Sequence, residues 1–96
     1  MPETEIKMTP FKNCTYVYQL IFKLSEECGE VSKAFYDIDT TPVDVVTPEQ
    51  VDKLAEECAD VMQVAFNILS WLNYDVQEVI DKVTEKNIAR GYYDAK

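Results

Sequence analysis

The residues best suited to chemistry are carboxylates that occur twice in the same pattern. Glu27 and Glu30 stand three residues apart, and 30 positions later Glu57 and Asp60 repeat the arrangement. In a helix, residues three apart lie on one face, so each pair presents its carboxylates together. Apolar residues recur at helical spacing around both pairs. They are Leu20, Leu24, Val31, Ala34 and Ile38 in the first copy, and Leu54, Val61, Val64, Ile68 and Leu72 in the second. We therefore expect the acids in or beside the buried faces of two helices.

Clustered, partly buried carboxylates require positive charge between them, because an unpaired buried charge is very costly. Lys23 and Lys53, each four residues before the first acid of its pair, could supply part of that charge. A divalent cation is the stronger candidate, since hard cations bind clustered carboxylate oxygens. A solvated acidic face is the alternative, and the inward placement and the repeat disfavour it. The predicted metal ligands are Glu27, Glu30, Glu57 and Asp60.

The elements that must position these acids are helices. The pattern is helical from Val17 to about Ile38, and Thr9–Pro10 is a further candidate helix start. Residues 39–46 carry turn chemistry and are expected to form a loop near the mouth of the site. Thr47, Pro48 and Gln50 form a capping box that opens a second helix, which runs to about residue 72.

A third helix is expected between a capping box at Asp75–Glu78 and a C-terminal cap at Gly91. The fold class is therefore all-α: three to four helices in an antiparallel bundle, with residues 1–96 as a single domain. Small residues at Gly29 and Ala59 would let the first two helices approach closely. Between residues 61 and 72 the second helix is apolar on nearly every side, which predicts completion of the bundle in a homodimer or a tetramer of dimers.

Composition excludes several classes of function. A formal net charge of −9 argues against nucleic-acid binding through a basic surface, and no apolar run is long enough for a membrane span. Histidine is absent, so the Glu-x-x-His pairs of di-iron bundles cannot form. An acidic, polar N-terminus is unlike a signal peptide. Cys14, Cys28 and Cys58 are interpreted as buried thiols of a cytoplasmic protein.

A third motif completes the set. Glu27-x-x-Glu30, Glu57-x-x-Asp60 and Lys86-Asn87-x-x-Arg90-Gly91 together resemble the all-α nucleotide pyrophosphohydrolases of the MazG type, over roughly residues 19 to 91. The resemblance implies an all-helical fold, a dimer or larger assembly, and hydrolysis of a nucleoside triphosphate to monophosphate and pyrophosphate. It also implies that Mg²⁺, or alternatively Mn²⁺, is held by the four paired acids.

Further roles follow for individual residues. Glu26 or Glu27 would orient the attacking water as general base, and spacing leaves the choice open. Lys86 and Arg90 would hold phosphates, and Asn87 a sugar, base edge or phosphate. The plainer alternatives are that Arg90 complements the helix C-terminus, Asn87 is a core amide and Lys86 a solvated charge.

Two other functions compete with a triphosphate pyrophosphohydrolase. One is a non-catalytic helical interaction protein whose acids face a partner. The other is a related pyrophosphohydrolase that acts on a phosphoribosyl nucleotide of histidine biosynthesis.

Overall fold

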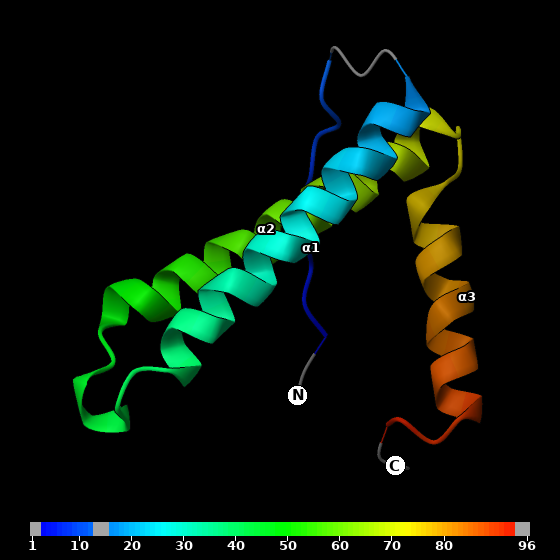
Figure 1. The fold of residues 1–96 in the computed structure, drawn as a ribbon. Coiled ribbons are helices and arrows are strands. Elements are labelled where there is room, and N and C mark those ends of the chain that lie inside the picture. The colour runs from blue at the N-terminus through cyan, green and yellow to red at the C-terminus, as the bar shows by residue number, and fades with distance from the viewer. Residues whose placement is uncertain (1–2, 13–15, 94–96) are drawn as a thin grey trace.

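The structure is a computed structural model that describes residues 3–12 and 16–93, and the regular elements in these ranges are all helical. They are α1 (Val17–Asp39), the short 3₁₀ helix η1 (Val43–Val45), α2 (Pro48–Trp71) and α3 (Val76–Ala89) (Figure 1). The predicted all-α class is confirmed. None of the described helices combines the length and the apolar character that crossing a membrane requires.

The first two long helices form an antiparallel hairpin (Figure 1). The apolar stripes expected from the sequence face each other. Leu20 of α1 and Val64 of α2 are the buried apolar residues of the hairpin. The capping box at the start of α2 is confirmed: Gln50 N donates to Thr47 Oγ1 at 3.3 Å, and Thr47 N donates to Gln50 Oε1 at 2.9 Å.

The tip of the hairpin is tied across its two helices. Gln50 Nε2 donates to Asp37 Oδ2 at 2.9 Å and to Thr41 Oγ1 at 3.2 Å, while Thr41 Oγ1 donates to the Asp37 carbonyl at 2.6 Å. These bonds fix the loop at the far end of the hairpin. The prediction that residues 39–46 lie near the mouth of the site is wrong, because none of them lines the acidic hollow.

An extended N-terminal segment crosses α2. Gln63 Nε2 donates to the Thr9 carbonyl at 2.9 Å, and Phe11 N donates to Asn67 Oδ1 at 3.0 Å. Gln63 Nε2 also donates to Asn67 Oδ1 at 3.0 Å, so the polar strip of α2 holds this segment. The candidate helix start at Thr9–Pro10 is wrong: this stretch is extended, and α1 begins at Val17.

The end of α2 and both ends of α3 are capped. Asn73, with φ 62°, ends α2 in a Schellman motif in which Tyr74 N donates to the Leu69 carbonyl. Asp75 then caps α3 by accepting from the backbone N–H groups of Gln77 and Glu78. Gly91, with φ 76°, ends α3 as predicted, in a second Schellman motif.

Packing of α3 is sparse. Among the described residues α3 contacts α2 near the point where the two join, makes no contact with α1, and diverges from the hairpin (Figure 1). A single chain therefore presents a splayed helix beside a hairpin. The apolar stripe of α3 is left largely uncovered beyond its start: Ile80 is 48% exposed and Val83 43%.

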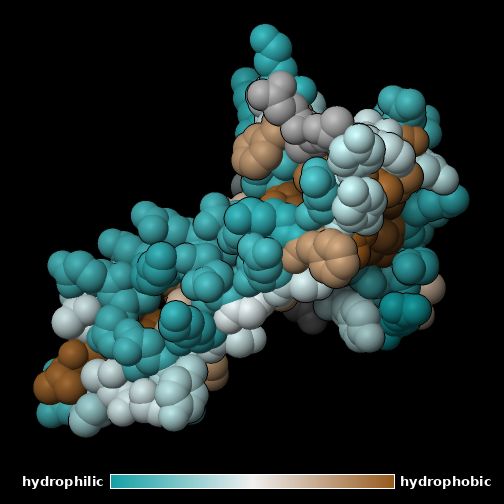
Figure 2. All heavy atoms as spheres, turned by 45° about the horizontal axis from the view of Figure 1, so that its top comes forward, coloured by the Kyte–Doolittle hydropathy of each residue, from teal (hydrophilic) through white to brown (hydrophobic). Residues whose placement is uncertain are grey.

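The chain is much more open than a compact domain of its length. Its radius of gyration is 16.3 Å, whereas a compact chain of this length has about 12.5 Å. Its accessible surface is 8126 Å², against about 5,650 Å² for a compact monomer of this mass. Figure 2 shows hydrophobic surface gathered at the hairpin tip and toward α3. On the apolar second half of α2 and at its C-cap, Met62, Trp71 and Leu72 are exposed in the single chain.

Two smaller predictions are wrong. Cys28 and Cys58 are free thiols, but both are exposed rather than buried; Cys14 lies outside the described residues. Gly29 does not allow close approach of α1 and α2, because a Cβ built there has no neighbouring atom within 4 Å. Cys28 and Cys58 lie on faces that the packing of the two helices leaves uncovered, and Gly29 lines the open acidic hollow.

Candidate metal centre

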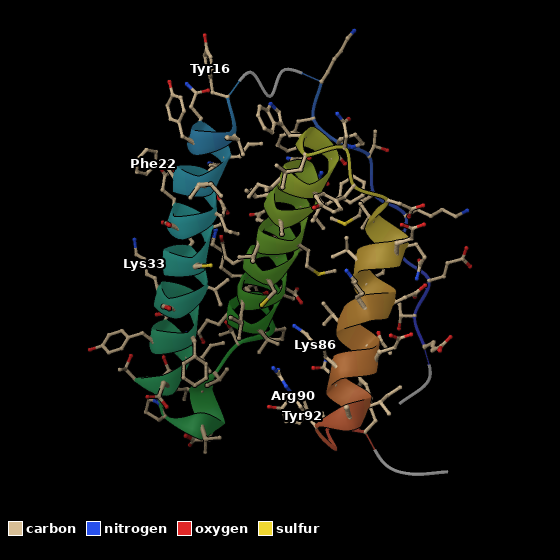
Figure 3. The ribbon with its side chains drawn as sticks, turned by 90° about the vertical axis from the view of Figure 1, so that its right-hand side faces the viewer. Tyr16, Phe22, Lys33, Lys86, Arg90 and Tyr92 are labelled. Atoms are coloured by element: carbon tan, nitrogen blue, oxygen red, sulfur yellow. The ribbon has the colours of Figure 1, made fainter. Side chains whose placement is uncertain are left out.

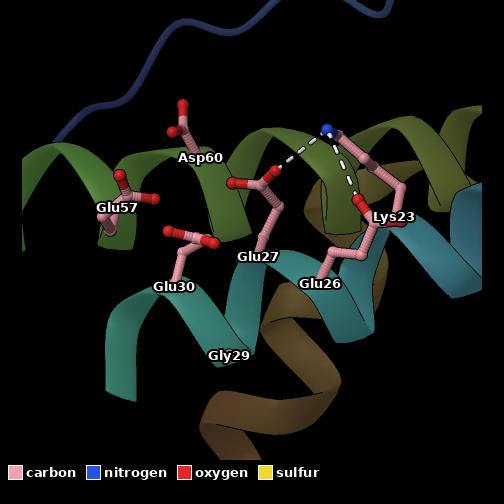
Figure 4. Close-up of a pocket in the computed structure, with 7 residues that line it drawn as sticks. All are labelled: Lys23, Glu26, Glu27, Gly29, Glu30, Glu57 and Asp60. Carbon is pink, nitrogen blue, oxygen red and sulfur yellow. Dashed lines mark ion pairs between the residues drawn. The ribbon is translucent and has the colours of Figure 1, made fainter. Parts of the chain in front are cut away.

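Three carboxylates meet where α1 and α2 face each other. Glu27 comes from α1, and Glu57 and Asp60 come from α2. One carboxylate oxygen from each lies within 4.8 Å of the others (Figure 4). Glu27 and Glu57 are buried, at 9% and 6% exposure, while Asp60 is exposed. The sequence repeat thus produces a convergent cluster, because the two copies lie opposite each other on the two antiparallel helices.

The cluster forms part of the wall of an open hollow of about 620 Å³. The fourth predicted ligand, Glu30, lines the same hollow without belonging to the tight group. Its carboxylate is directed toward Glu57 across the helix pair (Figure 4). The complete lining is Lys23, Glu26, Glu27, Gly29, Glu30, Glu57 and Asp60. All four acids named from the sequence therefore surround one volume.

Two lysines neutralise part of the acidic charge. Lys23 Nζ lies 3.1 Å from Glu27 Oε1, and Lys53 Nζ lies 2.8 Å from Glu57 Oε1. Hydrogen bonding to Glu27, and then the charge of that carboxylate, raises the pKa of Lys23 above its ordinary value. The bond to Glu57 raises the pKa of Lys53 in the same way. Both lysines are therefore firmly protonated, as the sequence suggested.

The donor set fits a hard divalent cation. Its three members are all carboxylates, which Mg²⁺, Mn²⁺ and Ca²⁺ prefer, and neither thiol nor imidazole contributes. Two of the carboxylates are buried side by side, an arrangement that costs free energy unless positive charge compensates. The hollow is open, so water and phosphate oxygens could complete the coordination.

The remaining candidate residues divide between two regions. Glu26 lines the hollow beside the cluster, and 69% of its side chain is exposed. Lys86, Asn87 and Arg90 belong to the end of α3 and do not line the hollow. Figure 3 shows Lys86 and Arg90 extending from α3 on the side of the hairpin. A single chain does not bring these three residues onto the acids.

One residue of the hollow was underrated from the sequence. Lys23 was identified merely as a source of charge, yet it forms part of the wall of the hollow and contacts Glu26 at 3.9 Å as well as Glu27. The signal that identifies it is its place four residues before Glu27, since residues at that spacing are neighbours on a helix.

The helical hairpin and its paired acids now have a counterpart among known domains. The family model of the MazG nucleotide pyrophosphohydrolase domain matches residues 17–92 of the chain. The match begins with α1, includes the whole acidic hollow and ends just after α3. The chain therefore belongs to the MazG nucleotide pyrophosphohydrolase domain family. Searches of curated proteins and of solved structures give no match.

Proposed function

We propose that this protein is a Mg²⁺-dependent hydrolase that cleaves a nucleoside or deoxynucleoside triphosphate to the monophosphate and pyrophosphate. The observation that carries the proposal is the convergence of Glu27, Glu57 and Asp60 on one point, within a domain of this family. Glu30, on the wall of the same hollow, is the fourth ligand in this proposal. The three-carboxylate cluster suits Mg²⁺, and Mn²⁺ can replace it.

Glu27, Glu57 and Asp60, with Glu30, would hold a divalent cation, which would supply charge neutralisation for the phosphates and a water of lowered pKa. The protein's own residues do the rest. Glu26 lines the hollow outside the tight cluster, so its carboxylate is available to accept a proton from the attacking water. The water oxygen bonds to the α-phosphorus, the bond between that phosphorus and the bridging oxygen breaks, and pyrophosphate leaves.

Phosphate binding is assigned to the end of α3. Arg90 can hold two phosphate oxygens at once, Lys86 adds a second cation, and Asn87 offers a donor and an acceptor to sugar, base or phosphate. Because these residues do not line the hollow of their own chain, the proposal places them in the hollow of a second copy.

A homodimer, or a tetramer of dimers, provides that second copy. The accessible surface exceeds that of a compact monomer by about 2,500 Å² per chain, which is the scale of an obligate interface. The exposed apolar side chains on the inner face of α3 and on the end of α2 would be covered in it. Trp71 and Leu72, at 43% and 45% exposure, are examples.

The test is a product analysis. The protein is incubated with Mg²⁺ and each of a panel of nucleoside triphosphates, deoxynucleoside triphosphates and a phosphoribosyl-ATP, and the products are separated. The proposal expects monophosphate and pyrophosphate in equal amounts from a triphosphate, and none with EDTA. Orthophosphate and diphosphate would contradict the site of attack. Turnover of phosphoribosyl-ATP alone would indicate the phosphoribosyl-nucleotide pyrophosphohydrolase of histidine biosynthesis. Absence of turnover with every nucleotide would favour a non-catalytic interaction protein.

A further inference from the structure

The two motif copies each contain an ion pair that the proposed metal centre would have to break. Lys23 binds Glu27 at 3.1 Å and Lys53 binds Glu57 at 2.8 Å, each across four residues of its own helix. The carboxylates they hold are the two buried members of the three-acid cluster. Each lysine also senses an acid of the opposite helix, Asp60 in the case of Lys23 and Glu30 in the case of Lys53. The two ammonium groups thus neutralise the cluster from its two ends.

These ammonium groups and a divalent cation require the same carboxylates. An ammonium group hydrogen-bonded to a carboxylate competes for its oxygens, and it repels a cation bound to that carboxylate. The lysines are able to move away, because 53% of the Lys23 side chain and 60% of the Lys53 side chain are exposed. Their flexible stems carry the charge on a compact, mobile head. Moving them leaves the hairpin core intact.

We propose that Lys23 and Lys53 are resident counter-ions of the acid cluster, which a divalent cation displaces on binding, and that Lys23, on the wall of the hollow, then faces the phosphates of the nucleotide. The inference rests on the proposed function, since it concerns the same centre. It assigns the two lysines a role in setting the metal affinity and in the order of binding.

The charge balance gives the displacement its purpose. Three carboxylates with two ammonium groups form a set that is net negative and repels a triphosphate. One divalent cation, together with the two freed ammonium groups, balances the charge of the four proposed ligands, Glu27, Glu30, Glu57 and Asp60, so the centre repels a triphosphate much less. Lys23 already lines the hollow, so its freed head lies where phosphates must enter. In this proposal, metal binding makes the site able to accept the substrate. Before the metal binds, the lysines compensate the charge of the acids.

The test measures metal binding without nucleotide. Lys23→Met, Lys53→Met and the double variant keep the apolar stems and remove the charges. More than half of each lysine side chain is exposed, so its ion pair competes only weakly with a metal, and removing it should change the binding constant by about two- to fivefold. We expect the Kd for Mn²⁺, measured by titration calorimetry, to fall by that factor in each single variant and to fall further in the double variant, without the two effects simply multiplying, because both lysines act on one cluster.

Thermal unfolding provides a second readout. In EDTA the variants should melt below the wild type, because the buried acids lose their counter-ions. With saturating Mn²⁺ that deficit should close, so the metal-induced rise in Tm becomes larger than in the wild type.

Two controls separate charge from displacement. Lys33→Met removes the same charge from the same helix at a residue with no ion pair among those found, and should leave both readouts unchanged. Lys53→Arg keeps the charge and should keep the wild-type Kd within about twofold. An unchanged or weaker affinity in Lys23→Met and Lys53→Met, while the wild type binds Mn²⁺, would overturn the inference alone. Absence of Mn²⁺ binding by the wild type would instead overturn the proposed metal centre.

Discussion

The α1–α2 hairpin and α3 differ in how much of their structure a single chain can hold in place. The hairpin buries Leu20 and Val64, ties its tip through Gln50 and carries an N-terminal segment across α2. By contrast, α3 is capped at both ends but contacts only the end of α2 among the described elements. Caps define where a helix begins and ends, but they do not determine where it lies. Position comes from side-chain packing, and α3 lacks most of it.

The division is also a division of chemistry. The acids that would bind metal lie on the hairpin, where two packed helices fix them within 4.8 Å of one another. The residues that would bind phosphate lie at the free end of α3. In the proposed function, one chain therefore holds half of a site, and assembly supplies the other half. The predictions that follow test the two regions separately.

The largest effect is expected on the hairpin. Glu57→Gln removes a buried acid that we propose as a metal ligand and should lower kcat by at least about 100-fold, since even the outer partners of metal ligands are worth 10- to 100-fold. The fold should remain, and stability in metal-free buffer should not fall sharply, because like-charge repulsion is relieved. Steady-state kinetics and circular dichroism measure both. Glu49→Gln, an exposed acid on the same helix, is the matched control, and equal losses in the two variants would refute the ligand assignment.

The next effect is expected on α3. Arg90→Ala should lower kcat/KM by about 10- to 100-fold, because a charge-assisted hydrogen bond contributes about 1.5–3 kcal/mol. The affinity for Mn²⁺ alone should not change, since Arg90 does not line the acidic hollow. Kinetics and metal titration on the same preparation distinguish the two. A variant that loses metal binding as well would show that the two regions do not act separately.

A smaller effect tests what holds the hairpin. Thr47→Ala deletes the acceptor for Gln50 N and breaks the capping box, which should reduce the free energy of unfolding by about 0.5–2 kcal/mol. Urea denaturation followed by circular dichroism measures the loss. Thr84→Ala in the interior of α3 is the comparison, because Thr84 caps no helix. If both variants unfold at the wild-type midpoint, the capping box does not stabilise the hairpin.

The smallest effect has the opposite sign. Gly29→Ala should increase the free energy of unfolding by about 0.5–1 kcal/mol, because Ala is the better helix former and the added Cβ meets no atom within 4 Å in the single chain. The measurement is again denaturation by urea. A loss of stability would show that a partner chain occupies the space beside Gly29, which would place the subunit interface at the hollow.

The sequence carries the local features of this fold well. The capping box at Thr47 and the C-terminal cap at Gly91 depend on neighbouring residues, and both were predicted correctly. The convergence of the acids could also be predicted from the sequence, because helical spacing and the repeat determine it. The place of Glu30 outside the tight cluster and the position of α3 were harder to predict. Both depend on how two helices are rotated and inclined relative to each other, which sequence periodicity does not specify.

Long-range polar contacts were not predictable. The bonds from Gln63 and Phe11 that hold the N-terminal segment on α2 join residues more than 50 positions apart. No sequence pattern within either segment predicts these hydrogen bonds. The exposure of Cys28 and Cys58 was missed for a related reason: helical spacing defines a face, but packing in three dimensions decides whether that face is covered.

The most direct test of the account is complementation between two impaired chains. Glu57→Gln and Arg90→Ala are purified separately, then unfolded together and refolded in equal amounts. If each hollow is completed by α3 of the other chain, a mixed dimer contains one site with every residue intact, and random pairing should restore about a quarter of the wild-type activity. If each chain builds its own site, both sites of the mixed dimer carry a lesion. Activity no higher than the mean of the two parents would then contradict the shared site.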